Sequence, residues 1–156
     1  MKYALSFLLL LLIQQPVQAQ SSTSQLEREI GITRTLINDK RNSLLAFNMS
    51  FTESEKEAFW PLYREYRNAM TNVETRQMSV IIDYAEHADN MTQEKARDLL
   101  NRHFIYAEQS LKIKQLYTRK FRVILPDIKV TRLMQLENRM DAAVSLKYAE
   151  GIPLME

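Results

Sequence analysis

The chain has 156 residues, a formal net charge of +2 and no cysteine. Its length suggests a single domain, and the lack of cysteine excludes disulfides, thiolate catalysis, iron–sulfur clusters, thiolate zinc sites and a lipid anchor on cysteine. Two glycines and four prolines leave few places for turns. Long helices and an all-α fold are therefore expected.

The first 19 residues have the pattern of a secretory signal peptide. Lys2 supplies a positive charge, residues 4–13 form an apolar run too short to span a bilayer, and Val-Gln-Ala ending at Ala19 fits a signal-peptidase site. We expect cleavage after Ala19, which leaves residues 20–156 as one exported domain with no stable membrane insertion. An uncleaved anchor is the alternative, and the polar residues and proline that end the apolar run early disfavour it.

Residues 24–47 are predicted to form the first helix. It would begin at a capping box, Ser-Gln-Leu-Glu at residues 24–27, in which the serine and glutamate side chains bind each other's backbone N–H groups. The apolar side chains expected near one face of this helix are Leu26, Ile30, Ile37, Leu44 and Phe47.

Residues 51–89 are predicted to form a long second helix, which starts at another capping box, Thr-Glu-Ser-Glu at residues 52–55. Roughly 36 helical residues would extend about 54 Å, so the molecule should be elongated. Pro61 should kink this helix and not end it, because the pattern continues beyond it. Trp60 is expected in the core because it follows Phe59, the first member of the apolar seam of this helix. The coiled-coil-like heptad seam consists of Phe59, Tyr63, Tyr66, Met70, Val73, Gln77, Val80, Tyr84 and His87.

Two further helices are predicted after a break at residues 86–91. The third, capped by Asn90 or Thr92, runs to about Leu125. It carries two adjacent apolar sets, so it should touch more than one neighbour or leave apolar surface in water. The first set is Leu100, Phe104, Ala107, Leu111, Phe121 and Leu125, and the second is Leu99, Tyr106, Ile113, Tyr117 and Ile124.

The fourth helix is predicted over residues 127–149. Pro126 separates it from the third helix, and Gly151 should stop it. The apolar tail at residues 152–155 is expected to pack on the bundle or on a second subunit. The apolar positions of the fourth helix are Leu133, Leu136, Met140, Val144 and Tyr148.

Charge is divided unevenly along the chain. Nine acidic and four basic residues give residues 52–94 a net charge of −5, whereas eleven basic and four acidic residues give residues 95–139 a net charge of +7. This division favours an antiparallel hairpin of the second and third helices. It also favours a second interpretation, in which a basic face of this segment, interrupted by apolar side chains, binds unfolded acidic or amphipathic segments. The candidate client-binding or partner-binding residues are Tyr106, Lys112, Ile113, Lys114, Tyr117, Arg119, Lys120, Arg122, Lys129 and Arg132.

No pattern in the sequence points to catalysis. It has no Gly-x-Ser-x-Gly, no Gly-rich phosphate loop and no carboxylate pair singled out as acid and base. His87 at the expected hairpin tip and His103 about three turns along the third helix are too far apart to share a metal within one subunit. We therefore expect no enzyme, no cofactor and no metal site. Export and the absence of helix-turn-helix spacing argue against a nucleic-acid partner.

Several motifs resemble the Spy/CpxP family of periplasmic proteins. Phe-Thr-Glu-Ser-Glu at residues 51–55 is similar to the family's Leu-Thr-x-x-Gln motif, with Phe for Leu and Glu for Gln, and residues 125–129 resemble a second copy that lacks the threonine. One branch of the family is similar over most of the chain beyond the signal peptide. The segments that carry this similarity are Phe-Trp-Pro-Leu-Tyr at residues 59–63, residues 121–126, Gln-Leu-Glu-Asn-Arg at residues 135–139 and Ile-Pro-Leu at residues 152–154.

The resemblance implies an elongated four-helix protomer with a long antiparallel hairpin, forming a cradle-like homodimer in the periplasm of a Gram-negative bacterium. Members of the family act as ATP-independent chaperones, as envelope-stress modulators or as metal binders, and the metal binders use clustered histidines that this sequence lacks. The expected function is a periplasmic chaperone-like or envelope-stress adaptor protein that binds unfolded or envelope polypeptides. The alternatives are a regulatory partner of one envelope protein and a metal-responsive protein.

Overall fold

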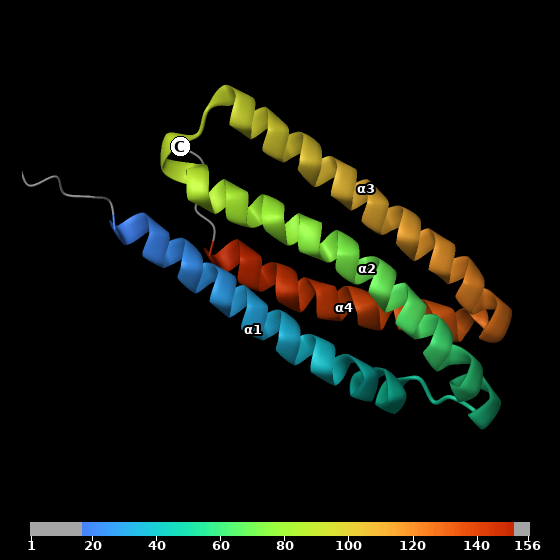
Figure 1. The fold of residues 1–156 in the computed structure, drawn as a ribbon. Helices are drawn as coiled ribbons and strands as arrows, with labels where there is room; N and C mark the ends of the chain where they lie inside the picture. The colour runs from blue at the N-terminus through green and yellow to red at the C-terminus, as the bar shows by residue number, and fades with distance from the viewer. Residues whose placement is uncertain (1–16, 152–156) are drawn as a thin grey trace, which may run out of the picture.

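The computed structural model describes residues 17–151, which form four long α-helices lying alongside one another in an elongated bundle (Figure 1). The predicted all-α four-helix protomer is confirmed. The helices are α1 (Val17–Asn48), α2 (Glu53–His87), α3 (Gln93–Ile124) and α4 (Asp127–Gly151), with a 3-10 turn η1 (Ala88–Asn90) before α3. Most of the predicted signal peptide and the tail at residues 152–156 lie outside the described residues. None of the described helices combines the length and the hydropathy that a bilayer crossing requires.

Helix α2 forms as the sequence predicts. The Thr52 hydroxyl accepts a hydrogen bond from the backbone N–H of Glu55, and the Glu55 carboxylate accepts one from the backbone N–H of Thr52, so the capping box is complete. The helix continues through Pro61 to His87. Its heptad seam faces the core, where the buried members are Phe59, Tyr63, Tyr66, Met70, Val73 and Val80.

Aromatic rings fill the core near the start of α2. The Phe59 ring centroid lies 4.5 Å from that of Phe51, 5.2 Å from that of Tyr63 and 5.6 Å from that of Phe121 on α3. Trp60 packs on the same cluster, 5.0 Å from Phe59, as expected. This cluster joins α2 to α3 close to the end of the bundle where both α1–α2 and α3–α4 turns lie (Figure 1).

The start of α1 differs from the prediction. The helix begins at Val17, so Ser24 lies within it and does not cap its N-terminus. Residues 17–23 contain neither glycine nor proline, and nothing in them interrupts helical backbone.

The buried stripe of α1 also differs from the predicted face. Leu44 is exposed and Phe47 is 86% exposed, whereas Leu45 and Met49 are fully buried. The stripe passes through Arg41, a charged residue that a pattern of apolar positions leaves out. Arg41 and Leu45 are four residues apart, which is the spacing of residues on one face of a helix.

The bundle consists of two closely packed pairs. The most extensive contacts are between α2 and α3, which form the predicted hairpin, and between α1 and α4. Asp83 of α2 pairs with Lys95 and Arg102 of α3, so opposite charges meet across the hairpin as expected. Thr92 caps α3 through its hydroxyl, which resolves the choice between Asn90 and Thr92.

Candidate functional site

A buried polar cluster lies between α1, α2 and α4. The Arg41 guanidinium of α1 lies 2.7 Å from the Glu137 carboxylate of α4, and their side chains are 4% and 0% exposed. Tyr63 of α2 donates its hydroxyl to the same carboxylate at 2.7 Å, and Arg67 reaches it at 3.4 Å. Glu137 is therefore neutralised by two arginines and hydrogen-bonded by a tyrosine, as a buried charge requires.

The surroundings of Glu137 change the acidity of its partners. Burial and the negative charge of Glu137 raise the pKa of Tyr63 far above its usual range, so the hydroxyl stays protonated and donates. Burial opposes the charge of Arg41, but attraction to Glu137 and Asp141 outweighs this and raises the pKa of the guanidinium. Burial likewise raises the pKa of Tyr66.

Further charges extend this cluster to all four helices. Asp141 of α4 bridges Arg41 at 3.3 Å and Lys114 of α3 at 2.9 Å. Glu74 of α2 accepts from Arg67 at 3.0 Å and lies 3.7 Å from Arg34 of α1. We call this set the polar network; its members are Arg34, Arg41, Tyr63, Arg67, Glu74, Lys114, Glu137 and Asp141.

A cavity of about 220 Å³ adjoins the polar network. All four helices contribute to its wall, including Arg41 of α1, Glu74 of α2, Lys114 of α3 and Tyr148 of α4. Burial raises the pKa of Tyr148, so its hydroxyl is a neutral donor and acceptor at physiological pH. We call this space the central cavity.

An apolar groove of about 340 Å³ runs between α1 and α4. Its wall is almost entirely apolar, and two cationic side chains, Lys40 and Arg139, also contribute to it. The apolar residues of this groove are Leu36, Ile37, Leu44, Leu136, Met140 and Ala143.

Large apolar side chains also remain exposed along α3. Leu100, Phe104 and Leu111 belong to the first predicted apolar set, whereas Ile105, Leu116 and Val123 belong to neither set. The helical period places Leu100, Phe104 and Leu111 in one row and Ile105, Leu116 and Val123 in a second. Phe104 is 62% exposed and Val123 is 84% exposed. The charged residues Lys112 and Arg119 lie between the two rows. We call these six apolar residues the outer α3 surface.

Four of the predicted binding residues are exposed cations beside this surface. Lys112 pairs with Glu108, Lys120 with Glu65 and Arg122 with Asp127, all at exposed positions where such pairs contribute little to stability. The exposed cations are Lys112, Arg119, Lys120 and Arg122.

The other predicted residues lie elsewhere. Tyr117 is 8% exposed in the core and Ile113 packs against that core, so the expected exposed ring at Tyr117 is absent. Both residues lie on the side of α3 that faces α2. The pattern of apolar residues alone does not distinguish this side from the outer side of the helix. Tyr106 is half-buried.

Three predicted cations bind other helices. Lys114 joins the polar network. Lys129 of α4 donates to the Glu55 carboxylate at 2.6 Å and to the Ser50 carbonyl at 2.8 Å, and Arg132 donates to the Asn48 carbonyl at 3.3 Å. Hydrogen bonds from Lys129 and from the Thr52 backbone lower the pKa of Glu55. These cations fasten helices together and do not form part of one binding face.

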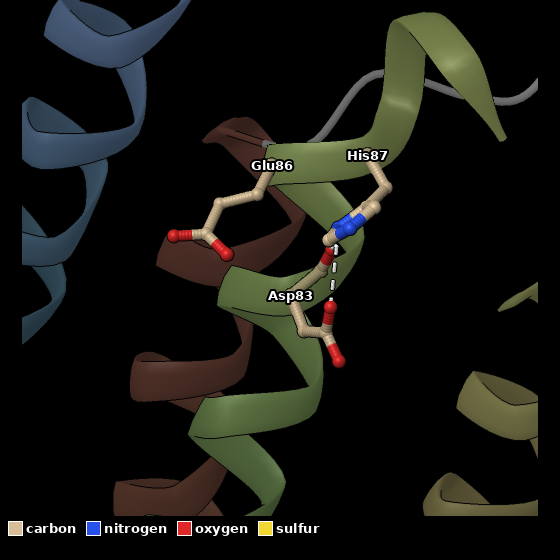
Figure 2. Close-up of side chains that lie close together, drawn as sticks. All are labelled: Asp83, Glu86 and His87. Carbon is tan, nitrogen blue, oxygen red and sulfur yellow. Dashed lines mark hydrogen bonds and ion pairs between the residues drawn. The ribbon is translucent and has the colours of Figure 1, made fainter.

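One group in the described part brings three possible metal ligands together, at the tip of the α2–α3 hairpin (Figure 2). Atoms of Asp83, Glu86 and His87 lie within 4.8 Å of one another, and His87 Nδ1 lies 3.1 Å from the Asp83 carboxylate. Lys95 and Arg102 already hold that carboxylate. Burial alone would raise the pKa of Asp83, but hydrogen bonds from these two cations lower it. A divalent cation at this position would compete with Lys95 and Arg102 for the Asp83 carboxylate.

Sequence reasoning missed the polar network and the central cavity. The signal was present, because Arg41 lies four residues after Ile37 and four before Leu45, and Glu137 lies four after Leu133 and three before Met140. A charge at a seam position of a helix indicates a buried partner.

No protein-family model, curated protein or solved structure matches the chain.

Proposed function

We propose that the protein is an exported, ATP-independent chaperone-like or stress-adaptor protein of the periplasm, which holds apolar polypeptide segments on the outer α3 surface. The Spy/CpxP-like motifs at residues 51–55 and 59–63 support this proposal from the sequence. The observation that carries it is the exposure of six large apolar side chains in two rows along one helix, because extensive apolar surface in water is typical of interaction sites.

Charge defines the kind of segment that this surface would accept. Four exposed cations, Lys112, Arg119, Lys120 and Arg122, lie on or beside the outer α3 surface. Segments that combine apolar side chains with carboxylates complement it. Exposed charges steer such encounters and are screened by salt, so binding is fast, weak and sensitive to ionic strength.

An aggregation assay tests this function. Insulin is reduced in the presence of the purified protein at a few-fold excess and low salt, and light scattering is recorded. We expect suppression of aggregation, and we expect the triple variant L100S/F104S/L111S to lose most of it. Because these side chains are exposed, the variant should retain its helical circular dichroism.

Phe47→Ser is the matched control, because Phe47 is also an exposed aromatic residue but lies on α1. It should suppress aggregation as well as the unchanged protein does. Failure of the unchanged protein to suppress aggregation, or equal activity in the triple variant, would sink the proposal.

The apolar groove between α1 and α4 favours a second candidate function, as a regulatory partner of one envelope protein. A groove with apolar walls between Lys40 and Arg139 suits one amphipathic acidic helix. This function predicts saturable binding to a single envelope protein that Leu36→Asp abolishes. It predicts no general suppression of aggregation, which separates it from the first.

We also propose a homodimer, in line with the family resemblance. Light scattering coupled to size-exclusion chromatography measures the assembly mass. A dimer that buries the outer α3 surface would protect Leu100 and Phe104 from solvent and remove the basis of the chaperone proposal, so this measurement comes before the aggregation assay.

A further inference from the structure

The central cavity has the construction of a binding site for a small charged molecule. Its wall comes from all four helices, and its charged side chains are held by partners from other helices. Lys114 and Asp141, for example, lie 2.9 Å apart across α3 and α4. Side chains held in this way keep their positions without a ligand, and such preorganisation lowers the cost of binding.

Two buried polar atoms, which belong to residues of the wall, have no hydrogen-bond partner among the described residues. They are Nε of Arg41 and Oε1 of Glu74. The Arg41 side chain is only 4% exposed and that of Glu74 is 19% exposed. A native interior satisfies nearly all of its buried polar atoms. Nε of Arg41 is a donor on a cation and requires an acceptor, whereas Oε1 of Glu74 is an acceptor on a carboxylate and requires a donor.

The charged side chains that line the central cavity indicate which class of ligand could bind there. Three cations, Arg34, Arg41 and Lys114, line the cavity together with two carboxylates, Glu74 and Asp141. Asp141 is already shared by Arg41 and Lys114. Oε2 of Glu74 lies 3.0 Å from Arg67 and 3.7 Å from Arg34, which leaves Oε1 without a partner among the described residues. A simple anion would meet Glu74, and a simple cation would meet the three basic groups. A molecule with one group of each sign satisfies both sides.

The volume and the lining of the central cavity limit the size and the chemistry of the rest of the ligand. About 220 Å³ is the space of about seven waters at roughly 30 Å³ each, which is below the usual range for drug-sized ligands. Met70 and Val144 give the wall an apolar part, and the hydroxyls of Ser145 and Tyr148 offer neutral hydrogen bonds. A short aliphatic or hydroxylated side chain suits this lining.

We propose that the central cavity binds a free α-amino acid, with the carboxylate of the ligand near Arg34 and Arg41 and its ammonium group near the carboxylate of Glu74. The site is separate from the outer α3 surface. It does not depend on the proposed chaperone function, and each can fail without the other.

The test is a thermal-shift titration of the purified protein, expressed from the full sequence, with each of the twenty L-amino acids. A ligand at about a hundredfold excess over its Kd should raise Tm by about 10 °C. Isobutyrate and isobutylamine, which each carry half of the charge pattern of valine, should give no comparable rise. Isothermal titration calorimetry of the best ligand then gives Kd and stoichiometry.

Two variants connect the binding to this cavity. Ser145→Phe fills the space from α4 without removing any member of the polar network, and Glu74→Gln removes the negative charge expected to face the ammonium group. Both should weaken the calorimetric affinity at least tenfold. Ser79→Phe, an equal change at an exposed position on α2 outside the cavity, should leave it unchanged.

The proposal is overturned if no amino acid raises Tm, if isobutyrate or isobutylamine raises it equally, or if the affinity persists in Ser145→Phe. The last result would place the binding elsewhere on the molecule. Should Glu74→Gln fail to fold because Arg67 loses its partner, Ser145→Phe still decides the outcome.

Discussion

The guanidinium of Arg41 and the carboxylate of Glu137 lie 2.7 Å apart with almost no exposure to solvent, although the residues are 96 positions apart in the chain. Replacing Glu137 by Leu leaves Arg41 with Asp141 and Arg67 with Glu74 as the remaining ion-pair partners, so the buried positive charge is only partly compensated. We expect a loss of about 3–5 kcal/mol in the free energy of unfolding, measured by urea denaturation followed by circular dichroism.

Asp127→Ala is the control for this variant, because Asp127 pairs with Arg122 at an exposed position. Its cost should stay below about 1 kcal/mol. Equal costs for Glu137→Leu and Asp127→Ala would show that the buried pair contributes no more than a surface pair. The double variant R41M/E137L should cost less than the sum of its two single changes, since they share one interaction.

Two neighbouring tyrosines on α2 should respond oppositely to loss of their hydroxyl groups. Tyr63→Phe removes the donor to Glu137 and leaves a buried carboxylate oxygen unsatisfied, so stability should fall by about 1–3 kcal/mol. The Tyr66 hydroxyl is buried and has no hydrogen-bond partner among the described residues. Tyr66→Phe should therefore leave the free energy of unfolding unchanged or raise it. A larger loss for Tyr66→Phe than for Tyr63→Phe would contradict this assignment.

Acid should weaken the hairpin tip through Asp83. Lys95 and Arg102 hold the pKa of this carboxyl below its usual range despite partial burial. A carboxyl whose pKa is lower in the folded state stabilises the fold above its unfolded pKa of about 4, and this contribution disappears as pH falls through the folded value. The stability difference between the unchanged protein and Asp83→Asn should be constant at neutral pH and shrink below about pH 4. A difference that stays constant down to pH 2 would argue against it.

The hairpin tip should not respond to zinc. Asp83 is occupied by Lys95 and Arg102, and His87 Nδ1 lies 2.8 Å from the Asp83 carbonyl oxygen. We expect no rise in Tm with zinc or nickel in excess at pH 7, with the chelator-treated protein as reference. A rise that His87→Ala removes would establish the metal-responsive alternative.

Client binding should depend on salt through the cations beside the outer α3 surface. The double variant K112Q/R119Q should reduce the association rate with an acidic amphipathic peptide several-fold at low salt and flatten its dependence on ionic strength. Stopped-flow fluorescence of a labelled peptide measures both. Arg76→Gln, at an exposed position on α2, is the matched control and should change neither.

Helix α2 could be predicted from the sequence because its fold depends on local information. The capping box at Thr52 and the repeat through Phe59, Tyr63 and Tyr66 involve residues a few positions apart. The three turns could be placed for the same reason, from the capping residues Thr52 and Thr92 and from Pro126.

The polar network could not be predicted in this way. Arg41 and Glu137 each look like a solvated charge within their own helix, and their burial follows only when α1 and α4 lie side by side. The same omission shifted the predicted face of α1 from Leu45 to Leu44. The central cavity depends on four helices at once, so no single stretch of sequence contains it.

Helix α4 supplies hydrogen bonds to the last residue of α1 and to the turn that follows it. No basic residue lies in the final turn of α1, and the carbonyls of Asn48 and Ser50 receive their hydrogen bonds from Arg132 and Lys129 of α4. During synthesis the ribosome releases α1 first and α4 last. The hydrogen bonds that Arg132 and Lys129 supply at this end of α1 can therefore form only after α4 has been synthesised.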